Sequence, residues 1–210
     1  LLICFSFLVQ NCKAQSNSTK INSRSKSPNL IVIMADDLGY EDVGFNGSKD
    51  IPTPNIDRIA DNGVKFTNGY TSYSVCGPSR AGFMTGRYGQ RFGFERNPQY
   101  KADDPNMGLP KEEKTIAEHL SSVGYTSGII GKWHLDFKYQ DAKTGKILPK
   151  MKRAPIGATI PDGPVNRGFD YFHGIHHAGH MDTIIENNKV IERIDEIHNL
   201  PRLTEKSVAY

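Results

Sequence analysis

A cysteine stands directly before a predicted helix start in the segment 75–87. Pro78 suits the first helical turn, where its missing N–H costs no hydrogen bond, and Arg80 follows on the same turn. Free backbone N–H groups and the positive end of the helix dipole would then face Cys76. Such a setting lowers the pKa of a thiol or stabilises a bound anion, so it is a candidate for chemistry. The alternative is a small buried cysteine in a turn.

Two adjacent aspartates, Asp36 and Asp37, follow a continuous apolar run at 28–34. This run, bounded by turn signals, predicts a buried central strand of the kind found in parallel sheets. Two carboxylates at the end of such a strand are costly without a cation, and oxygen ligands suit Ca²⁺ or Mg²⁺. Open α/β sheets also bind ligands at this end of their strands. The pair therefore predicts a metal site, with a solvated loop as the alternative.

A lysine and a histidine, Lys132 and His134, follow a second apolar run at 125–130. Because side chains alternate along an extended chain, residues two apart point to the same side. A cation beside an imidazole suits anion binding combined with proton transfer. The alternative is a solvated strand end.

The elements around these residues predict an α/β fold. In 53–63, a capping threonine, a first-position proline and a closing glycine predict a helix. Residues 64–70 are expected to form a strand leading to the cysteine, and a capping box at 115–118 starts a second helix. With the apolar run 125–130 the order becomes strand, helix, strand, which indicates a parallel sheet. An Asn-Asn pair predicts a hairpin over 183–193.

Three histidines, His176, His177 and His180, lie close together in the sequence. Such a cluster is compatible with zinc, with a substrate pocket or with no function. No cysteine lies nearby and the neighbouring carboxylates are only Asp182 and Glu186, so zinc is disfavoured. We favour a substrate pocket in which His177 and His180 contact the substrate.

The composition indicates a globular chain, since 37% of its 210 residues are hydrophobic and 23% are charged. That length is enough for one domain with a core. The formal net charge is only +3, and the basic excess lies in residues 1–28. Nothing indicates a nucleic-acid partner, which needs a dense basic face.

Residues 1–14 are predicted to be part of a signal peptide. Their apolar run, 1–9, is shorter than the roughly 20 residues of a membrane-spanning helix and fits the core of a secretory signal. The Ser/Asn/Lys-rich stretch 15–27 predicts a flexible linker. We expect export to a periplasmic, extracellular or lysosome-like compartment, with lipid anchoring at Cys12 as the alternative. An unpaired Cys76 in an exported protein requires an explanation.

Five segments resemble the formylglycine-dependent (type I) sulfatases, which are arylsulfatase-like members of the alkaline phosphatase superfamily. The matching segments are 29–39, 76–80, 85–87, 131–135 and 167–170. The resemblance covers roughly residues 28–210 and implies a mostly parallel central sheet flanked by helices. One departure is Asp136, where the family often has glycine and which is expected to alter the pocket wall.

In that family a formylglycine-generating enzyme oxidises the cysteine to 3-oxoalanine (formylglycine), whose hydrate is the nucleophile. The resemblance implies a metal site of Asp36, Asp37 and the modified Cys76, filled by calcium rather than magnesium. It also implies catalytic roles for Cys76, Arg80, Lys132 and His134, with Lys132 contacting the sulfate.

The implied function is hydrolysis of a sulfate ester on a small molecule or, more specifically, a sulfated carbohydrate. Basic residues in 138–164 form either a solvated loop or a rim that attracts a polyanion. The family's later active-site histidine, lysine and Asp-Asn pair are not present before Tyr210. We therefore expect an N-terminal, truncated part of the catalytic domain, with little activity alone. Two alternatives stay open: a phosphoester or phosphonate hydrolase of the same superfamily, and a non-catalytic protein that kept the fold.

Overall fold

The computed structural model describes residues 27–149 and 153–210. The predicted signal peptide, Cys12 and all but the last residue of the predicted linker lie outside these ranges. The chain divides into two compact units, Leu1–Ala35 and Asp36–Tyr210. In the described part of the first unit, 27–35, there is no helix or strand. Across the described ranges, no helix is long and apolar enough to cross a membrane.

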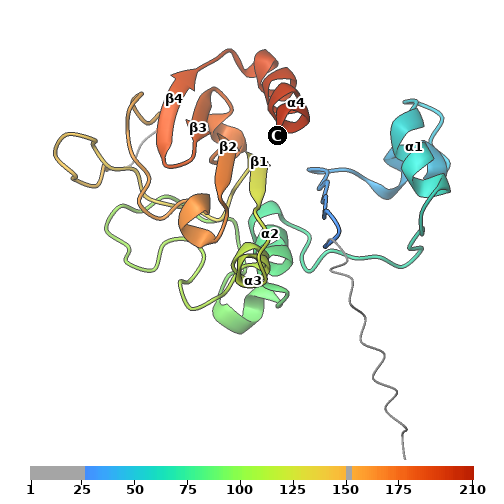
Figure 1. The fold of residues 1–210 in the computed structure, drawn as a ribbon, viewed down its shortest axis with the longest axis horizontal. Coiled ribbons are helices and arrows are strands. Elements are labelled where there is room, and N and C mark those ends of the chain that lie inside the picture. Colours follow the sequence, from blue (N-terminus) through green and yellow to red (C-terminus); the bar gives the residue numbers. More distant parts are fainter. Residues whose placement is uncertain (1–26, 150–152) are drawn as a thin grey trace, which may run out of the picture. The chain divides into compact units, whose positions relative to one another are not determined.

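A four-stranded sheet in the order β1-β2-β3-β4 forms the centre of the second unit (Figure 1). Its strands are β1 (Gly128–Lys132), β2 (Tyr171–Ile175), β3 (Thr183–Glu186) and β4 (Lys189–Arg193). β1 and β2 are parallel, as the strand–helix–strand order predicts, whereas the β2–β3 and β3–β4 pairs are antiparallel. The sheet is therefore of the predicted α/β kind, but only one pair among the described strands is parallel. The predicted hairpin is the β3–β4 pair.

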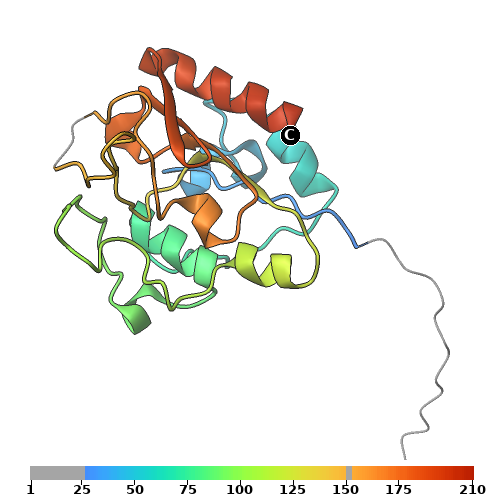
Figure 2. The same cartoon turned by 60° about the vertical axis from the view of Figure 1, so that its left-hand side comes forward.

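Within the described ranges, four α-helices accompany the sheet: α1 (Pro54–Asp61), α2 (Cys76–Thr85), α3 (Ile116–Ser122) and α4 (Asn199–Ala209). α2 and α3 lie beside each other in both views (Figures 1 and 2). α4 lies against β1 and β2, and the ring of Tyr210 that follows it stacks on Tyr171 with 5.4 Å between centroids. Short 3-10 helices lie at Tyr40–Asp42, Gly44–Asn46, Gly89–Phe92, Pro164–Arg167, Ala178–His180 and Glu196–His198.

The helix boundaries follow the local sequence signals. At the start of α3, the Thr115 hydroxyl accepts a hydrogen bond from the Glu118 amide at 3.2 Å, and the Glu118 carboxylate accepts one from the Thr115 amide at 2.7 Å. This is the predicted capping box. α2 begins at Cys76, just before the predicted start, and its C-cap is Gly86, which adopts the left-handed conformation with φ 64°.

The hydrophobic core is built largely by the extended segment that follows β1. Its apolar side chains pack with those of β2, β3 and β4, which places the residues next to them in a fixed and dry environment. The fully buried members with the largest side chains include Trp133, Leu135, Phe137, Tyr139, Ile160, Phe172, Ile184, Ile185 and Val190.

Two predicted strands are absent from the described residues. The run 28–34, expected as a buried central strand, has no strand structure, and Ile31 and Ile33 are 85% and 81% exposed. Residues 64–70 are also irregular, with Phe66 80% exposed. Neither segment has a hydrogen-bonded neighbour strand among the described residues, and an unpaired backbone does not hold a strand. Apolar patterning identified candidate strands but carried no information about their partners.

Candidate active site

Two cationic side chains from different sequence motifs meet the carboxylate of Asp36. The Lys132 ammonium nitrogen lies 2.6 Å from Asp36 Oδ2, and Arg80 Nη2 lies 3.8 Å from Asp36 Oδ1. Arg80 also donates a hydrogen bond through Nη1 to the backbone carbonyl of Lys132 at 2.6 Å. The structure thus brings together residues that the sequence analysis assigned to one site.

Secondary structure fixes the two cations of this group. Arg80 lies on α2 and Lys132 is the last residue of β1, and their side chains are only 11% and 7% exposed. Partial burial opposes ionisation of Asp36, but the hydrogen bond and charge of Lys132, then Arg80 and a hydrogen bond from Cys76, hold its pKa below the usual value. Asp36 is therefore a carboxylate at neutral pH, in contact with two nearly buried cations.

Cys76 is the first residue of α2, whereas the sequence predicted the helix to start directly after it, and it is the free cysteine of the described residues. The Gly77 amide in the first turn donates a hydrogen bond to the Asn97 side chain at 2.7 Å. A Cβ at Gly77 would lie 3.3 Å from the His134 carbonyl oxygen, so the start of α2 packs against the backbone of His134. Asn97 was not singled out from the sequence, because it lies in an irregular segment without a motif.

His134 is buried, with 9% of its surface exposed, directly after β1. Its amide donates to the His176 carbonyl at 2.7 Å, which extends the β1–β2 pairing by two residues. Burial, followed by the charges of Lys132 and His176, lowers the pKa of His134 to about 4. Its Nδ1 has no hydrogen-bond partner among the described residues. The imidazole is thus neutral at pH 7 and can accept a proton.

The sequence analysis expected Lys132 and His134 to point to the same side of an extended strand, but the backbone at His134 is not extended. His134 has φ 55° and is therefore in the left-handed region rather than extended. Both residues still lie at the end of β1, and the charge of Lys132 contributes to the lowered pKa of His134. Their proximity comes from the end of β1 as a whole and not from a shared face of a strand.

Asp37 is exposed and makes no hydrogen bond or ion pair with the residues that the structure describes. Its φ of 62° places it in the left-handed region, which aspartate tolerates better than most residues. The adjacent carboxylates of Asp36 and Asp37 are the hard oxygen donors that Ca²⁺ prefers. The carboxylate of Asp36 already contacts a cation, since the Lys132 ammonium lies 2.6 Å from its Oδ2. These residues fit part of a calcium shell, which takes about 6–8 oxygen ligands.

The three histidines of the cluster lie close together in space. Nitrogen atoms of His176, His177 and His180 lie within 4.8 Å of one another. His177 stacks on His134 with 5.5 Å between ring centroids, so the cluster adjoins His134. Burial and then the neighbouring His176 and His180 lower the pKa of His177 to about 3. Burial, followed by His176, also lowers the pKa of His180.

Asp136 is buried and contacts this cluster. Its Oδ1 lies 2.8 Å from Nε2 of His176 and also accepts a hydrogen bond from the Phe137 amide at 3.0 Å. Asp136 has φ 59°, a left-handed conformation that suits glycine and is tolerated by aspartate. Sequence reasoning expected Asp136 to alter the pocket wall but did not identify His176 as its partner. The sequence feature that could have indicated this contact is a carboxylate at a position where glycine is favoured.

Two arginines of the matching segments have structural contacts. Arg87 lies 2.5 Å from Oε1 of the buried Glu113, and Arg167 donates to the backbone carbonyls of Leu109 and Pro110 at 2.8 and 3.1 Å. These contacts tie the segment before α3 to α2 and to the turn before β2. We assign both arginines to the scaffold of the site.

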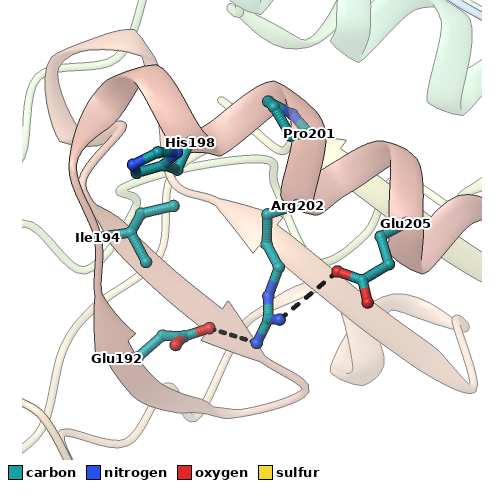
Figure 3. A pocket seen from close by; sticks show the side chains of 6 residues that line it. All are labelled: Glu192, Ile194, His198, Pro201, Arg202 and Glu205. Atoms are coloured by element: carbon teal, nitrogen blue, oxygen red, sulfur yellow. Dashed lines mark hydrogen bonds and ion pairs between the residues drawn. The ribbon is translucent and has the colours of Figure 1, made fainter.

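Two cavities lie outside the Asp36 group. One of about 880 Å³ is lined in part by Trp133, Asp136 and Arg167. The other, of about 290 Å³, lies between β4 and α4 (Figure 3). In it Arg202 contacts Glu192 at 2.7 Å and Glu205 at 3.8 Å, so its charge is compensated.

The sulfatase family model matches residues 28–198, which is more than half of the chain. The chain belongs to the sulfatase family. It is 42% identical to steryl-sulfatase of Homo sapiens over 151 residues, covering 70% of this chain and 23% of that relative. It is 39% identical to arylsulfatase A of Homo sapiens over 151 residues, covering 72% of this chain and 26% of that relative. The chain thus spans about a quarter of the length of these curated relatives.

Solved structures confirm the predicted fold class. The PsFucS1 sulfatase from Pseudoalteromonas sp. is similar with a TM-score of 0.62 and 25% identity, covering 84% of this chain and 38% of that chain. A protein solved in complex with its substrate D-glucosamine-2-N,6-O-disulfate has a TM-score of 0.60 and 27% identity, covering 88% of this chain and 31% of that chain. The sequence-based assignment to the sulfatases is therefore confirmed.

Proposed function

We propose that this sulfatase-family protein hydrolyses a sulfate ester at Cys76 and that a sulfated carbohydrate is its substrate. The observation that carries the proposal is the contact of Lys132 with Asp36 at 2.6 Å, with Arg80 beside both. A sulfate group entering here would meet two cations that are already positioned and nearly dehydrated. Charges held in this way stabilise a transition state without reorganising.

Arg80 and Lys132 have complementary parts in binding the anion. Arg80 offers a planar fork of N–H donors, which matches two oxygens of a tetrahedral anion, while Lys132 acts as a compact charge. Both side chains are largely shielded from water, where their attraction for an anion is stronger than at an exposed surface. In the proposed reaction they offset negative charge on the sulfuryl group as the ester bond breaks.

Cys76 is the proposed site of modification. As a hydrated formylglycine it would supply two geminal hydroxyls, one to displace the alcohol from sulfur and one whose deprotonation releases sulfate. A formylglycine-generating enzyme is the partner that this chemistry requires. The start of α2 would hold the modified residue against the backbone of His134.

His134 is the proposed general base. Its lowered pKa of about 4 keeps the imidazole neutral at pH 7, and its Nδ1 has no partner among the described residues. A neutral, buried imidazole near the modified cysteine can take a proton from a hydroxyl and pass it to water. The positive charge of Lys132 favours the neutral form of the His134 imidazole, which is the form that can accept a proton.

Asp36, Asp37 and the oxygen of modified Cys76 would hold Ca²⁺, with Mg²⁺ as the alternative. When bound, the ion supplies charge stabilisation to a sulfate oxygen and acidifies a neighbouring hydroxyl. Asp36 is ionised and accessible to such an ion, because its side chain is 45% exposed. Asp36 would hold the ion beside the Lys132 ammonium, which lies 2.6 Å from its Oδ2.

Similar structures and residues of this chain support the carbohydrate assignment. A structurally similar protein was solved with D-glucosamine-2-N,6-O-disulfate, and another with k-i-k-neocarrahexaose. The His177 ring lies 5.5 Å from the His134 ring and 4.3 Å from the His180 ring, between centroids, and this supports the proposal that His177 and His180 contact the substrate. Exposed lysines such as Lys143 and Lys146 would add to a rim that attracts a polyanion. We also propose that the protein is exported.

The test is sulfate release from sulfated glycosaminoglycan disaccharides, with nitrophenyl sulfate and nitrophenyl phosphate measured in parallel. The proposal expects release of sulfate from a sugar and loss of turnover in Cys76→Ser with an unchanged fold. Faster cleavage of the phosphate would instead favour a phosphoester or phosphonate hydrolase of the same superfamily. An active serine variant would contradict the mechanism.

A further inference from the structure

We propose that His176, His177 and His180 form a binding site for a transition-metal ion of the zinc class, separate from the aspartate site. One nitrogen from each of the three side chains lies within 4.8 Å of the others. Imidazole nitrogen is a preferred ligand of such ions, whereas the carboxylates near Cys76 suit a hard cation. The chemistry of the two donor sets is therefore different.

The three histidines lie on one short connection between β2 and β3. His177 precedes the 3-10 helix Ala178–His180, and His180 is its last residue. A tetrahedral zinc ion with Zn–N distances of about 2.0–2.1 Å needs nitrogens about 3.4 Å apart. The distances of up to 4.8 Å between these nitrogens must therefore shorten by at most about 1.4 Å, and all three ligands belong to a single segment of chain that can make this adjustment.

His180 gives a second and independent observation. The residue is 8% exposed, and its Nδ1 is buried without a hydrogen-bond partner among the described residues. A buried polar nitrogen left unpaired costs free energy, so such groups are uncommon unless an ion or water meets them. A metal ion at the centre of the cluster would satisfy this nitrogen.

Asp136 supplies the partner that a metal-binding histidine commonly has. Nε2 of His176 lies 2.8 Å from Asp136 Oδ1, so this nitrogen donates its proton to the carboxylate and Nδ1 keeps its lone pair. A carboxylate–histidine–metal arrangement fixes the ring and raises its basicity. Nδ1 now lies 3.3 Å from the Tyr139 hydroxyl, a long contact that the metal would replace. The negative charge of Asp136 would also offset part of the ion's charge.

His177 has one contact that competes with metal binding. Its Nδ1 accepts a hydrogen bond from the Gly179 amide at 3.0 Å. Gly179 is exposed, so water can take over this amide when the ring turns toward an ion. In the proposed function His177 and His180 line the substrate pocket, and metal and sugar would then compete for the same face of the cluster.

The experiment is a calorimetric titration of the full chain with zinc, in a Cys76→Ser background so that no thiol in the described domain binds the metal. We expect one zinc ion per chain, and cobalt(II) absorption of the tetrahedral type. His180→Gln and His177→Gln should each weaken binding by about 100-fold or more. Asp136→Asn should weaken it by about 10- to 100-fold. His119→Gln, an exposed histidine on α3, is the matched control and should bind like the parent.

Unfolding of each variant is monitored by circular dichroism without metal, so that a loss of binding is separated from a loss of fold. His177, which is only partly buried, is the variant expected to disturb the fold least. Binding below one equivalent, or unchanged binding in the His177 and His180 variants, would overturn the proposal. Loss of zinc in Asp36→Asn alone would place the ion at the aspartates instead. None of these results bears on oxidation of Cys76, so the two proposals fail independently.

Discussion

The ammonium nitrogen of Lys132 lies 2.6 Å from Oδ2 of Asp36, and this contact joins the end of β1 to the start of the second compact unit. Arg80 from α2 approaches the same carboxylate from 3.8 Å. The site is therefore built where a strand end and a helix start meet one ionised carboxylate. The predictions that follow test whether this meeting point performs the chemistry.

Lys132→Ala and Asp36→Asn should each lower kcat/KM for a sulfate ester by about 100-fold or more. The reason is that each change removes a charge positioned at the reacting group, an effect of about 10²–10³ in rate when one preorganised donor is lost. Sulfate release measured at several substrate concentrations checks this. Lys65→Ala is the control, because Lys65 is an exposed lysine whose ion pair is with the exposed Asp61 at 3.0 Å. Equal activity of both lysine variants would contradict the assigned role.

Arg80→Lys should also lower kcat by about 100-fold, although it keeps the charge. Arg80 contacts both the Lys132 carbonyl, at 2.6 Å, and Asp36, and a lysine cannot reproduce this fork. Steady-state kinetics of the variant provide the measurement. Arg58→Lys, on the exposed part of α1, serves as the matched control. If Arg80→Lys had full activity, the contribution of Arg80 to catalysis would come from its charge alone and not from the geometry of its guanidinium group.

Arg87→Ala should reduce stability rather than chemistry. It leaves the carboxylate of Glu113, which is 7% exposed, without its partner at 2.5 Å. Leaving such a group unpaired costs about 1–3 kcal/mol. Urea unfolding of the variant measures this, with Lys111→Ala, an exposed neighbour, as the control. Unchanged stability combined with lost turnover would instead place Arg87 in the catalytic machinery.

Acid should destabilise the fold partly through His134. Burial, then Lys132 and His176, hold its pKa at about 4, against about 6.5 in an unfolded chain. Between these values the unfolded chain binds a proton that the folded chain does not. The free energy of unfolding is therefore highest, as far as His134 is concerned, above about pH 6.5. It falls as the pH drops toward 4, by on the order of 2 kcal/mol for this one group.

Urea unfolding near pH 7 and near pH 4 measures the effect, and His134→Gln should lose less stability on acidification than the parent. His119→Gln, which removes an exposed histidine, should behave as the parent does. An identical pH dependence of parent and His134→Gln would show that His134 titrates normally.

Local signals predicted much of the fold. The proline after Cys76 and the capping box at Thr115 indicated the starts of α2 and α3, because helix ends depend on hydrogen bonds within a few residues. Pairing was harder. The run 28–34 was predicted as a buried strand, yet it has no ladder partner among the described residues and Ile31 is 85% exposed. The pattern of apolar residues along one segment does not identify the strand with which that segment would pair.

Motif resemblance assigned Asp36, Arg80 and Lys132 to one site, and the structure brings these three residues together. The pairing of Asp136 with His176 was not predicted, because it depends on how β1 and β2 align and on the left-handed conformation of Asp136. Contacts of this kind come from tertiary register, which short motifs do not encode.

Peptide mass mapping of the protein from its native host tests the central claim most directly. In protein that releases sulfate, the peptide that contains position 76 should have the mass expected for formylglycine, an aldehyde, in place of cysteine. Cys76→Ser purified in the same way provides the control for the peptide assignment. A plain thiol at Cys76 in active protein would contradict the account, because the proposed nucleophile would then not exist.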